Sequence, residues 1–267
     1  MPLLEVRSVS KYFGGVQALK DIDLVIGESQ IIGLIGPNGA GKTSFFNAIT
    51  GLIKVDSGKI IFASSQTRSG RDPRFRLDNL PPNRIMEKGI ARTFQNLRIF
   101  KNMTLLENVS IGFHSRTRSG LWDAFLNTRR FKTEEKMIFA KSMELLRFVG
   151  LESLGNEIAG TLPYGSQKRV EIARALACEP KLLLLDEPAA GMNPTEKEEI
   201  SEIIRHIRER KIAVLLIEHD MKVVMPLSDR VMVMDEGQKI AEGLPEEVQK
   251  NQRVIEAYLG QDETSLP

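Results

Sequence analysis

The sequence predicts an α/β fold with a parallel core sheet, an N-terminal antiparallel β region and an inserted helical subdomain. Three observations lead to this prediction. Leu182–Leu185 and Ala213–Ile217 are unbroken apolar runs, typical of parallel strands that are covered on both faces. The residues up to Ile26 instead alternate apolar and polar side chains in two stretches, as antiparallel strands do. From about Leu105 to Leu176 the apolar spacing becomes mostly helical.

Length and composition indicate one large globular domain. The chain has 267 residues, of which 42% are hydrophobic and 27% charged, and its formal net charge is +2. The charges are interspersed, so they provide no broad basic field for nucleic acid, and we expect none as a partner. We expect a single domain over 1–267, with a core over about 1–98 and 178–245, a helical subdomain over about 99–177, and a C-terminal helix and tail over about 246–267.

Cysteine usage and hydropathy limit the chemistry and the location. Cys178 is the only cysteine, which excludes an internal disulfide and a cysteine-cluster metal site and fits a reducing compartment. Its apolar neighbours predict a small core residue. No stretch approaches the roughly 20 apolar residues that cross a bilayer, and Met1–Glu5 lacks the features of a signal peptide. A membrane role is therefore expected to depend on a partner.

The N-terminal elements are predicted from their spacing. Leu3–Ser8 and Ala18–Ile26 form antiparallel strands around a turn over Lys11–Val16. The further predictions are a strand over Ile31–Ile35, a helix over Thr43–Ile49, a strand over Ser57–Phe62 and a long, arginine-rich surface loop over Ser64–Asn83.

The C-terminal half alternates helices with strands. Thr133–Val149 is amphipathic and stops at Gly150, and a charged helix over Thr195–Arg210 joins the two apolar strands by a right-handed crossover. The remaining predictions are a hairpin of Arg230–Asp235 and Gln238–Glu242 around Glu236–Gly237, and a short closing helix over Pro245–Leu259.

A glycine-rich segment between a predicted strand and a predicted helix matches the phosphate-loop pattern GxxxxGK[ST]. Glycines let the backbone curl so that its N–H groups point at phosphate oxygens, and the positive end of the helix dipole adds to the attraction. Lys42 is expected to reach the β and γ phosphates, and the Thr43 hydroxyl to hold Mg²⁺. The predicted nucleotide-binding residues are Gly36, Pro37, Asn38, Gly39, Ala40, Gly41, Lys42, Thr43 and Ser44.

Two adjacent carboxylates, Asp186 and Glu187, follow the apolar run Leu182–Leu185. Ligands of open α/β sheets bind at the carboxyl ends of the strands, and two carboxylates there are costly without a cation. Asp186 fits the acidic residue that organises Mg²⁺, and Glu187 fits the group that polarises an attacking water. Together with the phosphate loop, the pair predicts nucleotide hydrolysis.

These motifs occur in the order found in ABC-transporter ATPase subunits, which the chain resembles over nearly its whole length. The matching segments are Gly36–Thr43, Gln95, Leu162–Gln167, Asp186–Glu187 and His219. The resemblance implies that Gln95 senses Mg²⁺ and water and that His219 touches the γ phosphate. It also implies that Phe13, or alternatively Tyr12, stacks on adenine. The implied catalytic residues are Glu187, His219 and Gln95, and the implied metal-binding residues are Thr43, Gln95 and Asp186.

The signature loop of that family, usually LSGGQ, corresponds here to Leu162–Gln167 and departs from it. Pro163 stands in place of the serine, Tyr164 in place of the first glycine and Ser166 in place of the glutamine. Gly165, Ser166 and the start of the following helix still offer backbone donors to an anion. Asn193 likewise stands where an aspartate is common. In the family a phosphate loop and a signature loop from two chains close over each ATP, so the resemblance implies a dimer.

The departures resemble the larger ATPase of branched-chain amino-acid transporters. The segments concerned are LPYG, AAGMNP and IEHDM, together with Gly89–Asn96 and the tail Val254–Gly260. The resemblance implies ATP and Mg²⁺ as ligands, integral membrane permease subunits and a second ABC ATPase subunit as partners, and an extracytoplasmic solute-binding protein as an indirect partner. It places the chain at the cytoplasmic face of the inner membrane. Arg92 and Phe100 are considered for the surface that transmits movement to the membrane partner, although ordinary helix and core roles fit them equally.

Four other functions are weighed against an amino-acid importer. An importer of urea or short-chain amides resembles the same pattern. A non-transport ABC ATPase is disfavoured because the chain has neither a second cassette nor a long heptad insertion. A GTPase or small-molecule kinase leaves Gln95 and His219 unexplained, and no NKxD guanine-reading motif is present. A catalytically silent cassette is opposed by four intact residues, which are Lys42, Asp186, Glu187 and His219.

Overall fold

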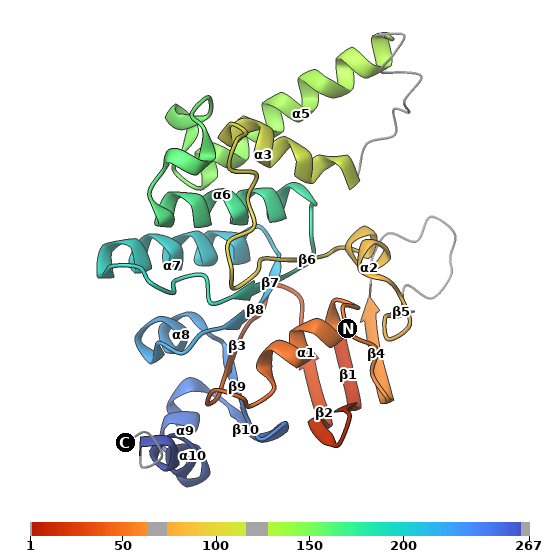
Figure 1. Ribbon diagram of the computed structural model, residues 1–267, viewed down its shortest axis with the longest axis vertical. Helices are drawn as coiled ribbons and strands as arrows, with labels where there is room; N and C mark the ends of the chain where they lie inside the picture. Colours follow the sequence, from red (N-terminus) through yellow and green to blue (C-terminus); the bar gives the residue numbers. More distant parts are fainter. Residues whose placement is uncertain (1, 64–73, 116–127, 263–267) are drawn as a thin grey trace.

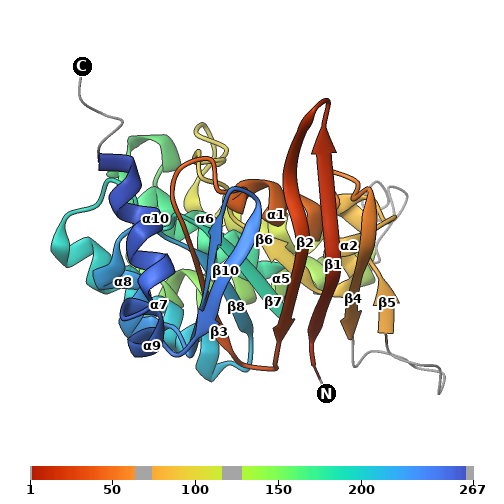
Figure 2. The ribbon, with the colours of Figure 1, turned by 90° about the horizontal axis from the view of Figure 1, so that it is seen from below.

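The computed structural model describes residues 2–63, 74–115 and 128–262. These residues form a four-stranded sheet and a six-stranded sheet with helices packed against them, which confirms the expected α/β class (Figure 1). Viewed from below, the antiparallel sheet lies at one side of the molecule and the C-terminal helices lie at the other (Figure 2). Within the described ranges, no helix is long and apolar enough to cross a membrane.

The four-stranded sheet is antiparallel in its paired strands and has the order β2-β1-β4-β5. Its strands are β1 (Leu4–Phe13), β2 (Val16–Ile26), β4 (Ser57–Ala63) and β5 (Arg74–Arg76). The turn expected over Lys11–Val16 is wrong, because Phe13 pairs with Val16 and only Gly14 and Gly15 connect the strands. The surface loop expected over Ser64–Asn83 is wrong at β5, where Phe75 pairs with Phe62 and continues the sheet. Residues 64–73 of that prediction lie outside the described residues.

The six-stranded sheet has the order β10-β9-β3-β8-β7-β6 and is parallel from β9 to β6. Its strands are β3 (Ile31–Ile35), β6 (Ile90–Arg92), β7 (Leu182–Asp186), β8 (Ala213–Ile217), β9 (Arg230–Asp235) and β10 (Gln238–Gly243). Strand β10 pairs antiparallel with β9, which confirms the predicted hairpin. Every residue of β3, β7 and β8 is buried, as the unbroken apolar runs predict.

Helices cover both faces of the parallel sheet. Helix α1 (Lys42–Ile49) packs Phe45 and Phe46 into the core between the two sheets, and Leu182 and Leu184 enter the same core. Leu183 and Leu185 point into a second core on the opposite face. Helices α7 (Pro194–Glu209) and α8 (Met221–Leu227) contribute to that second core. The sheet is thus held rigidly between two cores, with its strand ends free to carry a site.

A helical layer lies beyond α7 (Figure 1). It consists of α3 (Leu105–Gly112), α5 (Arg129–Phe148) and α6 (Tyr164–Ala177), with short 3₁₀ helices at Phe113–Ser115, Glu152–Leu154 and Ala159–Thr161. The predicted amphipathic helix and its stop are confirmed, since Gly150 follows α5 with φ +71°. A further helix, α2 (Pro82–Lys88), precedes β6.

The closing helix expected over Pro245–Leu259 is instead two helices, α9 (Pro245–Gln249) and α10 (Gln252–Asp262). Lys250 and Asn251 separate them, and the side-chain oxygen of Asn251 accepts a hydrogen bond from the backbone N–H of Arg253 at 3.0 Å. Asparagine side chains compete with helical hydrogen bonds in this way, so the break has a local cause.

We expect Gly112→Ala to lower the free energy of unfolding by about 2 kcal/mol or more. A Cβ at this position would lie 2.4 Å from the Arg174 carbonyl oxygen, so α3 and α6 would have to separate. Gly15→Ala is the control, because nothing lies within 4 Å of its added Cβ. Urea denaturation of both variants measures the effect, and equal midpoints would contradict the close packing.

Candidate functional site

The loop after β3 is shaped by glycine. Gly36, Gly39 and Gly41 have φ values of +148°, +82° and +95°, a region that other residues rarely adopt. A Cβ at Gly36 would lie 2.0 Å from the Met234 carbonyl oxygen, so backbone from β9 presses directly on the loop. The loop is therefore curled tightly over the carboxyl end of the sheet.

Helix α1 begins inside this curl without a side-chain cap. Gly41 is its N-cap residue, and no acidic side chain occupies the first turn. The N–H groups at a helix start need acceptors, and an anion satisfies both them and the helix dipole. The Lys42 ammonium donates to the carbonyl oxygens of Gly36 at 2.6 Å and Pro37 at 2.8 Å, so it lies across the mouth of the loop. This arrangement fits a bound phosphate chain.

Lys42 also lies in the field of the two predicted carboxylates. Burial lowers the pKa of Lys42, while the nearby carboxylates of Glu187 and Asp186 act in the opposite direction. Asp186 is the last residue of β7 and is buried. The fold thus brings the phosphate loop and the carboxylate pair to one edge of the sheet.

Arg92 of β6 is the direct partner of Asp186. Its guanidinium donates to Asp186 Oδ2 at 2.7 Å and to Asn47 Oδ1 at 2.6 Å, which ties β7 to α1. The Arg92 side chain is only 7% exposed, which fits the core role considered for it as the alternative. The sequence offered no signal for this pairing, because Arg92 and Asp186 meet only through the parallel register of β6 and β7.

Three catalytic candidates from distant parts of the chain meet at Glu187. Gln95 Nε2 donates to Glu187 Oε2 at 3.2 Å, and His219 Nδ1 lies 3.9 Å from the same oxygen. Glu187 itself has φ +47°, and its backbone N–H donates to the Ile217 carbonyl at 3.0 Å. A non-glycine residue in this conformation is a strained feature of the kind that functional sites retain.

Sequence reasoning missed Glu218, which supports the turn after Glu187. Its buried carboxylate accepts from the Ala189 backbone N–H at 2.8 Å. Burial raises the pKa of Glu218, and the Glu187 carboxylate adds to this, whereas Ala189 and His219 oppose it. The only signal in the sequence was an acidic residue directly after the apolar strand β8.

Gly165 and Ser166 lie in the first turn of α6, after Pro163 as N-cap. Gly165 is buried against Glu196 of α7, since an added Cβ would lie 2.7 Å from a Glu196 carboxylate oxygen. Ser166 Oγ accepts from the Arg169 guanidinium at 3.3 Å. In Figure 1 this end of α6 belongs to the helical layer, apart from the loop between β3 and α1. The structure does not bring these two residues to the phosphate loop of the same chain.

Phe13 and Tyr12 end β1 and are both about half exposed. The Lys11 ammonium lies 5.4 Å from the centre of the Phe13 ring. Asn193, which stands where an aspartate is common, is the N-cap of α7. Its side chain accepts from the Glu196 N–H at 3.0 Å, and the Glu196 carboxylate accepts from the Asn193 N–H at 3.0 Å. An Asn-Pro-Thr-Glu sequence is a recognisable start of this kind.

The C-terminal helix α10 borders the phosphate loop, which the sequence did not predict. A hollow of about 410 Å³ is lined by Asn38, Gly39, Ala40, Asp235, Glu236, Glu256 and Ala257. Burial raises the pKa of Tyr258 to about 12, and the nearby backbone N–H of Gly36 acts in the opposite direction. The last turns of the described chain therefore lie against the start of the loop.

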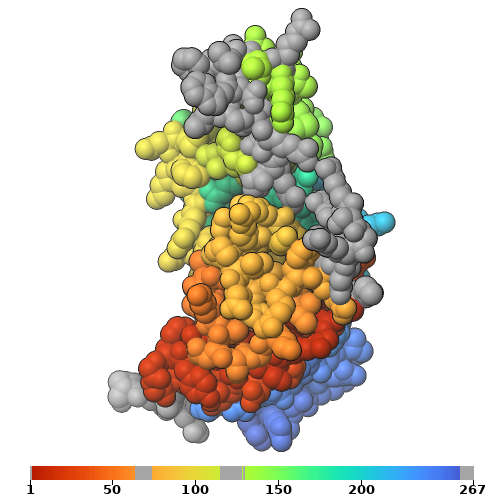
Figure 3. Space-filling view, turned by 90° about the vertical axis from the view of Figure 1, so that its right-hand side faces the viewer, coloured from red at the N-terminus to blue at the C-terminus, as the bar shows by residue number. Residues whose placement is uncertain are grey.

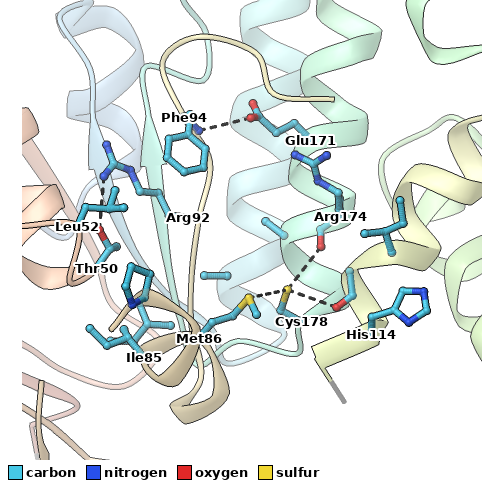
Figure 4. Close-up of a pocket in the computed structure, with 16 residues that line it drawn as sticks. Thr50, Leu52, Ile85, Met86, Arg92, Phe94, His114, Glu171, Arg174 and Cys178 are labelled. Carbon is cyan, nitrogen blue, oxygen red and sulfur yellow. Dashed lines mark hydrogen bonds between the residues drawn. The ribbon is translucent and has the colours of Figure 1, made fainter. Parts of the chain in front are cut away.

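A separate, mostly apolar groove of about 430 Å³ opens beside β6 (Figure 4). Figure 3 shows this side of the molecule, with the gold atoms of α2 at its centre and the yellow atoms of the segment that follows β6 beside them. The groove is lined by Thr50, Leu52, Pro82, Ile85, Met86, Ile90, Ala91, Arg92, Phe94, Ile111, Gly112, His114, Glu171, Arg174, Ala175 and Cys178. Cys178 is buried, as predicted, and its Sγ lies 3.5 Å from the Gly112 carbonyl. Phe100 is half exposed near Arg174.

Comparison with known proteins gives two family matches. Residues 19–190 match the family described as ABC transporter, and residues 238–264 match the one described as branched-chain amino acid ATP-binding cassette transporter. The chain is 41% identical to LivG of Escherichia coli strain K12, a high-affinity branched-chain amino acid transport ATP-binding protein, over 97% of this chain and 98% of that protein. It is 40% identical to BraF of Pseudomonas aeruginosa, described in the same words, with the same coverage.

Solved structures show the same similarity. A nucleotide-free ATP-binding cassette from an ABC transporter has a TM-score of 0.81 at 34% identity, covering 97% of this chain and 99% of its own. The ADP conformation of an ATP-binding cassette of an ABC transporter has a TM-score of 0.80 at 32% identity, with the same coverage. A dimeric cassette bound to ADP and Pi has a TM-score of 0.73 at 24% identity and shares the fold.

We expect Glu218→Gln to stabilise the protein increasingly as pH rises. The unfolded chain ionises this carboxyl near 4.5 and the folded chain only at a higher pH. The stability contributed by the protonated group is therefore fully present below pH 4.5 and is lost as pH rises through the folded pKa. Glutamine keeps an oxygen for the Ala189 N–H and does not titrate.

Urea denaturation between about pH 4 and pH 8 tests this expectation. The gain of Glu218→Gln over the wild type should grow with pH, whereas Glu202→Gln on the exposed side of α7 should show no such trend. A gain that stays constant across this range would show that Glu218 is not held protonated by the fold.

Proposed function

The chain belongs to the ABC transporter family, and from this premise we propose that it binds and hydrolyses ATP to energise an importer of branched-chain or other amino acids. The observation that carries the proposal is the convergence of Gln95 and His219 on Glu187, beside the phosphate loop. A loop that only bound nucleotide would not need three polar side chains at the strand end. Hydrolysis requires a base near the γ phosphate, and Glu187 is that base.

The site residues fit ATP and Mg²⁺. The uncapped start of α1 and the curled residues Gly36 to Ser44 offer N–H donors to the phosphates, and Lys42 offers a charge. The residues that would hold Mg²⁺ are Asp186, Thr43 through its hydroxyl and Gln95 through the oxygen of its side-chain amide. Together they offer the oxygen ligands that Mg²⁺ prefers. Gln95 donates to Glu187 through its nitrogen, which leaves its oxygen for the metal. When bound, Mg²⁺ neutralises charge on the phosphate oxygens.

Each side chain then has one task in hydrolysis. Glu187 accepts a proton from the attacking water, and Gln95 holds the Glu187 carboxylate in place. Lys42 stabilises the negative charge on the β and γ phosphates. His219, mostly exposed, donates to the γ phosphate. Phe13 stacks on adenine, with the preceding residue Tyr12 as its alternative; both side chains are about half exposed.

Two chains are needed for each ATP. Gly165 and Ser166 lie in the helical layer, away from the phosphate loop of their own chain, so they serve the nucleotide of a second ABC ATPase subunit (Figure 1). The first turn of α6 offers backbone donors there even though Pro163 and Tyr164 replace the usual residues. The second subunit is an identical or a related chain.

Integral membrane permease subunits are the partners of the apolar groove. The groove is lined by Phe94, and the next residue, Gln95, contacts Glu187. A movement of the permease at the groove is therefore transmitted to Glu187 through this segment. The end of an apolar permease helix fits its lining of Leu52, Ile85 and Ile111. In this proposal the chain lies peripherally at the cytoplasmic face of the inner membrane, and an extracytoplasmic solute-binding protein acts through the permease.

The match of residues 238–264 and the LivG and BraF relatives favour branched-chain amino acids as the transported solute. They also favour transport over a non-transport ABC ATPase. A urea or amide importer is the second candidate, because the solute is recognised by other subunits.

We expect Glu187→Gln to lower the rate of ATP hydrolysis by about 100-fold or more while ATP binding remains. Glutamine keeps the shape of the side chain but accepts no proton. Steady-state hydrolysis and fluorescent-nucleotide binding measure the two properties. Glu202→Gln, an exposed change of the same chemistry, should leave both properties unchanged, and Lys42→Met should lose binding. Undiminished hydrolysis in Glu187→Gln would remove Glu187 from the role of base.

We expect Leu52→Glu to reduce membrane association of the chain by about tenfold when it is co-expressed with the permease subunits of its transporter. Leu52 lines the groove and is 49% exposed, so a carboxylate there disturbs docking without entering the core. Val16→Glu, at a position 69% exposed on the antiparallel sheet, is the control. Equal sedimentation of both variants with the membranes would rule out the groove as the docking place.

A further inference from the structure

The segment that carries Gln95 has no regular secondary structure, although it lies between β6 and α3. Its backbone groups at Phe94, Gln95 and Arg98 instead bond to side chains of α6. Buried backbone groups need partners, and a strand or helix normally supplies them. Here the partners are charged side chains on a helix of another layer.

Lys168 supplies the bonds to carbonyl groups. Its side chain is 1% exposed, and its ammonium donates to the carbonyl oxygens of Phe94 at 2.8 Å and Gln95 at 3.2 Å. It also donates to Glu171 Oε2 at 3.3 Å. An ammonium has three protons, and these contacts account for all of them.

Glu171 supplies the complementary bonds to N–H groups. Its side chain is 2% exposed, and Oε1 accepts from the backbone N–H of Phe94 at 3.4 Å and of Arg98 at 3.2 Å. Figure 4 shows this carboxylate directed at Phe94 across the groove wall. One turn further along α6, the Arg174 guanidinium donates to the Arg98 carbonyl. Lys168, Glu171 and Arg174 thus form a stripe on one face of α6.

A fully buried ion pair is a costly way to stabilise a fold. Removing two charges from water costs free energy that their attraction only partly returns, and apolar residues of similar size often serve stability as well or better. The Lys168–Glu171 pair lies about one turn after the signature residues Gly165 and Ser166. Lys168 donates to the backbone carbonyl of Gln95, whose side chain contacts Glu187. The placement of the pair is therefore better explained by the geometry that it imposes than by stability.

We propose that the buried Lys168–Glu171 pair is a positioning device that locks the Gln95 segment to α6 and so sets the contact between Gln95 and Glu187. The proposal rests on the proposed function. Neither residue touches the reacting atoms. Both act through Gln95, so a shift of α6 that arises at its signature end moves Gln95 relative to Glu187.

The test is the double variant Lys168→Met/Glu171→Leu, which removes both charges together and leaves neither buried alone. We expect its kcat for ATP hydrolysis to fall about tenfold or more while KM for ATP stays within about twofold, because Gln95 is misplaced and the phosphate loop is intact. Hydrogen exchange at the Phe94 and Arg98 amides should accelerate. The matched control is Glu202→Gln/Arg205→Met, which removes an exposed pair of the same spacing on α7 and should change none of these values.

A second variant guards against a folding defect. Glu171→Asp keeps both charges but shortens the carboxylate by one methylene, and we expect a smaller fall in kcat, again at nearly constant KM. Faster amide exchange with unchanged kcat in both variants would overturn the positioning role. Unchanged amide exchange would show that the Lys168–Glu171 pair does not hold the backbone of the Gln95 segment. If the wild type did not hydrolyse ATP, the proposed function would fail, whereas the exchange measurement would still decide whether the pair holds the segment.

Discussion

Charge compensation at the carboxyl end of β7 is the constraint on which the rest of the site depends. Asp186 and Glu187 are neighbours at the end of a buried strand, where negative charge is costly. Arg92 pairs directly with Asp186. Lys42 lies near both carboxylates, and their negative charges act to raise its pKa. The cations come from the neighbouring strand β6 and from the start of α1, so the compensation joins both elements to the end of β7.

The same constraint explains why several contacts hold Glu187 and the turn that follows it. Glu187 is held by its own backbone bond to Ile217 and by Gln95, while Glu218 fixes the turn that follows through Ala189. These contacts come from β8 and from the segment after β6. A group that acts as a base must keep its position when water and phosphate arrive, and two separate segments hold Glu187 here.

Local patterns predicted the elements that depend on local physics. The apolar runs predicted β7 and β8, and the glycine spacing predicted the loop before Lys42, because strand burial and backbone curvature leave direct traces in composition. The Arg92–Asp186 pair and the hydrogen bonds from Lys168 and Glu171 to the Gln95 segment were not predicted, since each depends on how distant segments pack. Strand β5 and the break at Asn251 were missed because short elements carry weak periodicity.

The position of α10 has a consequence for how related chains diverge. Its residues Glu256 and Ala257 face Asn38 and Gly39 across a hollow, and Tyr258 lies near Gly36. Changes near the chain end therefore alter the surroundings of the loop between β3 and α1 without altering the sheets or the carboxylate pair. Related chains can therefore differ in the wall of the phosphate loop through substitutions in this terminal helix, while the two sheets stay the same.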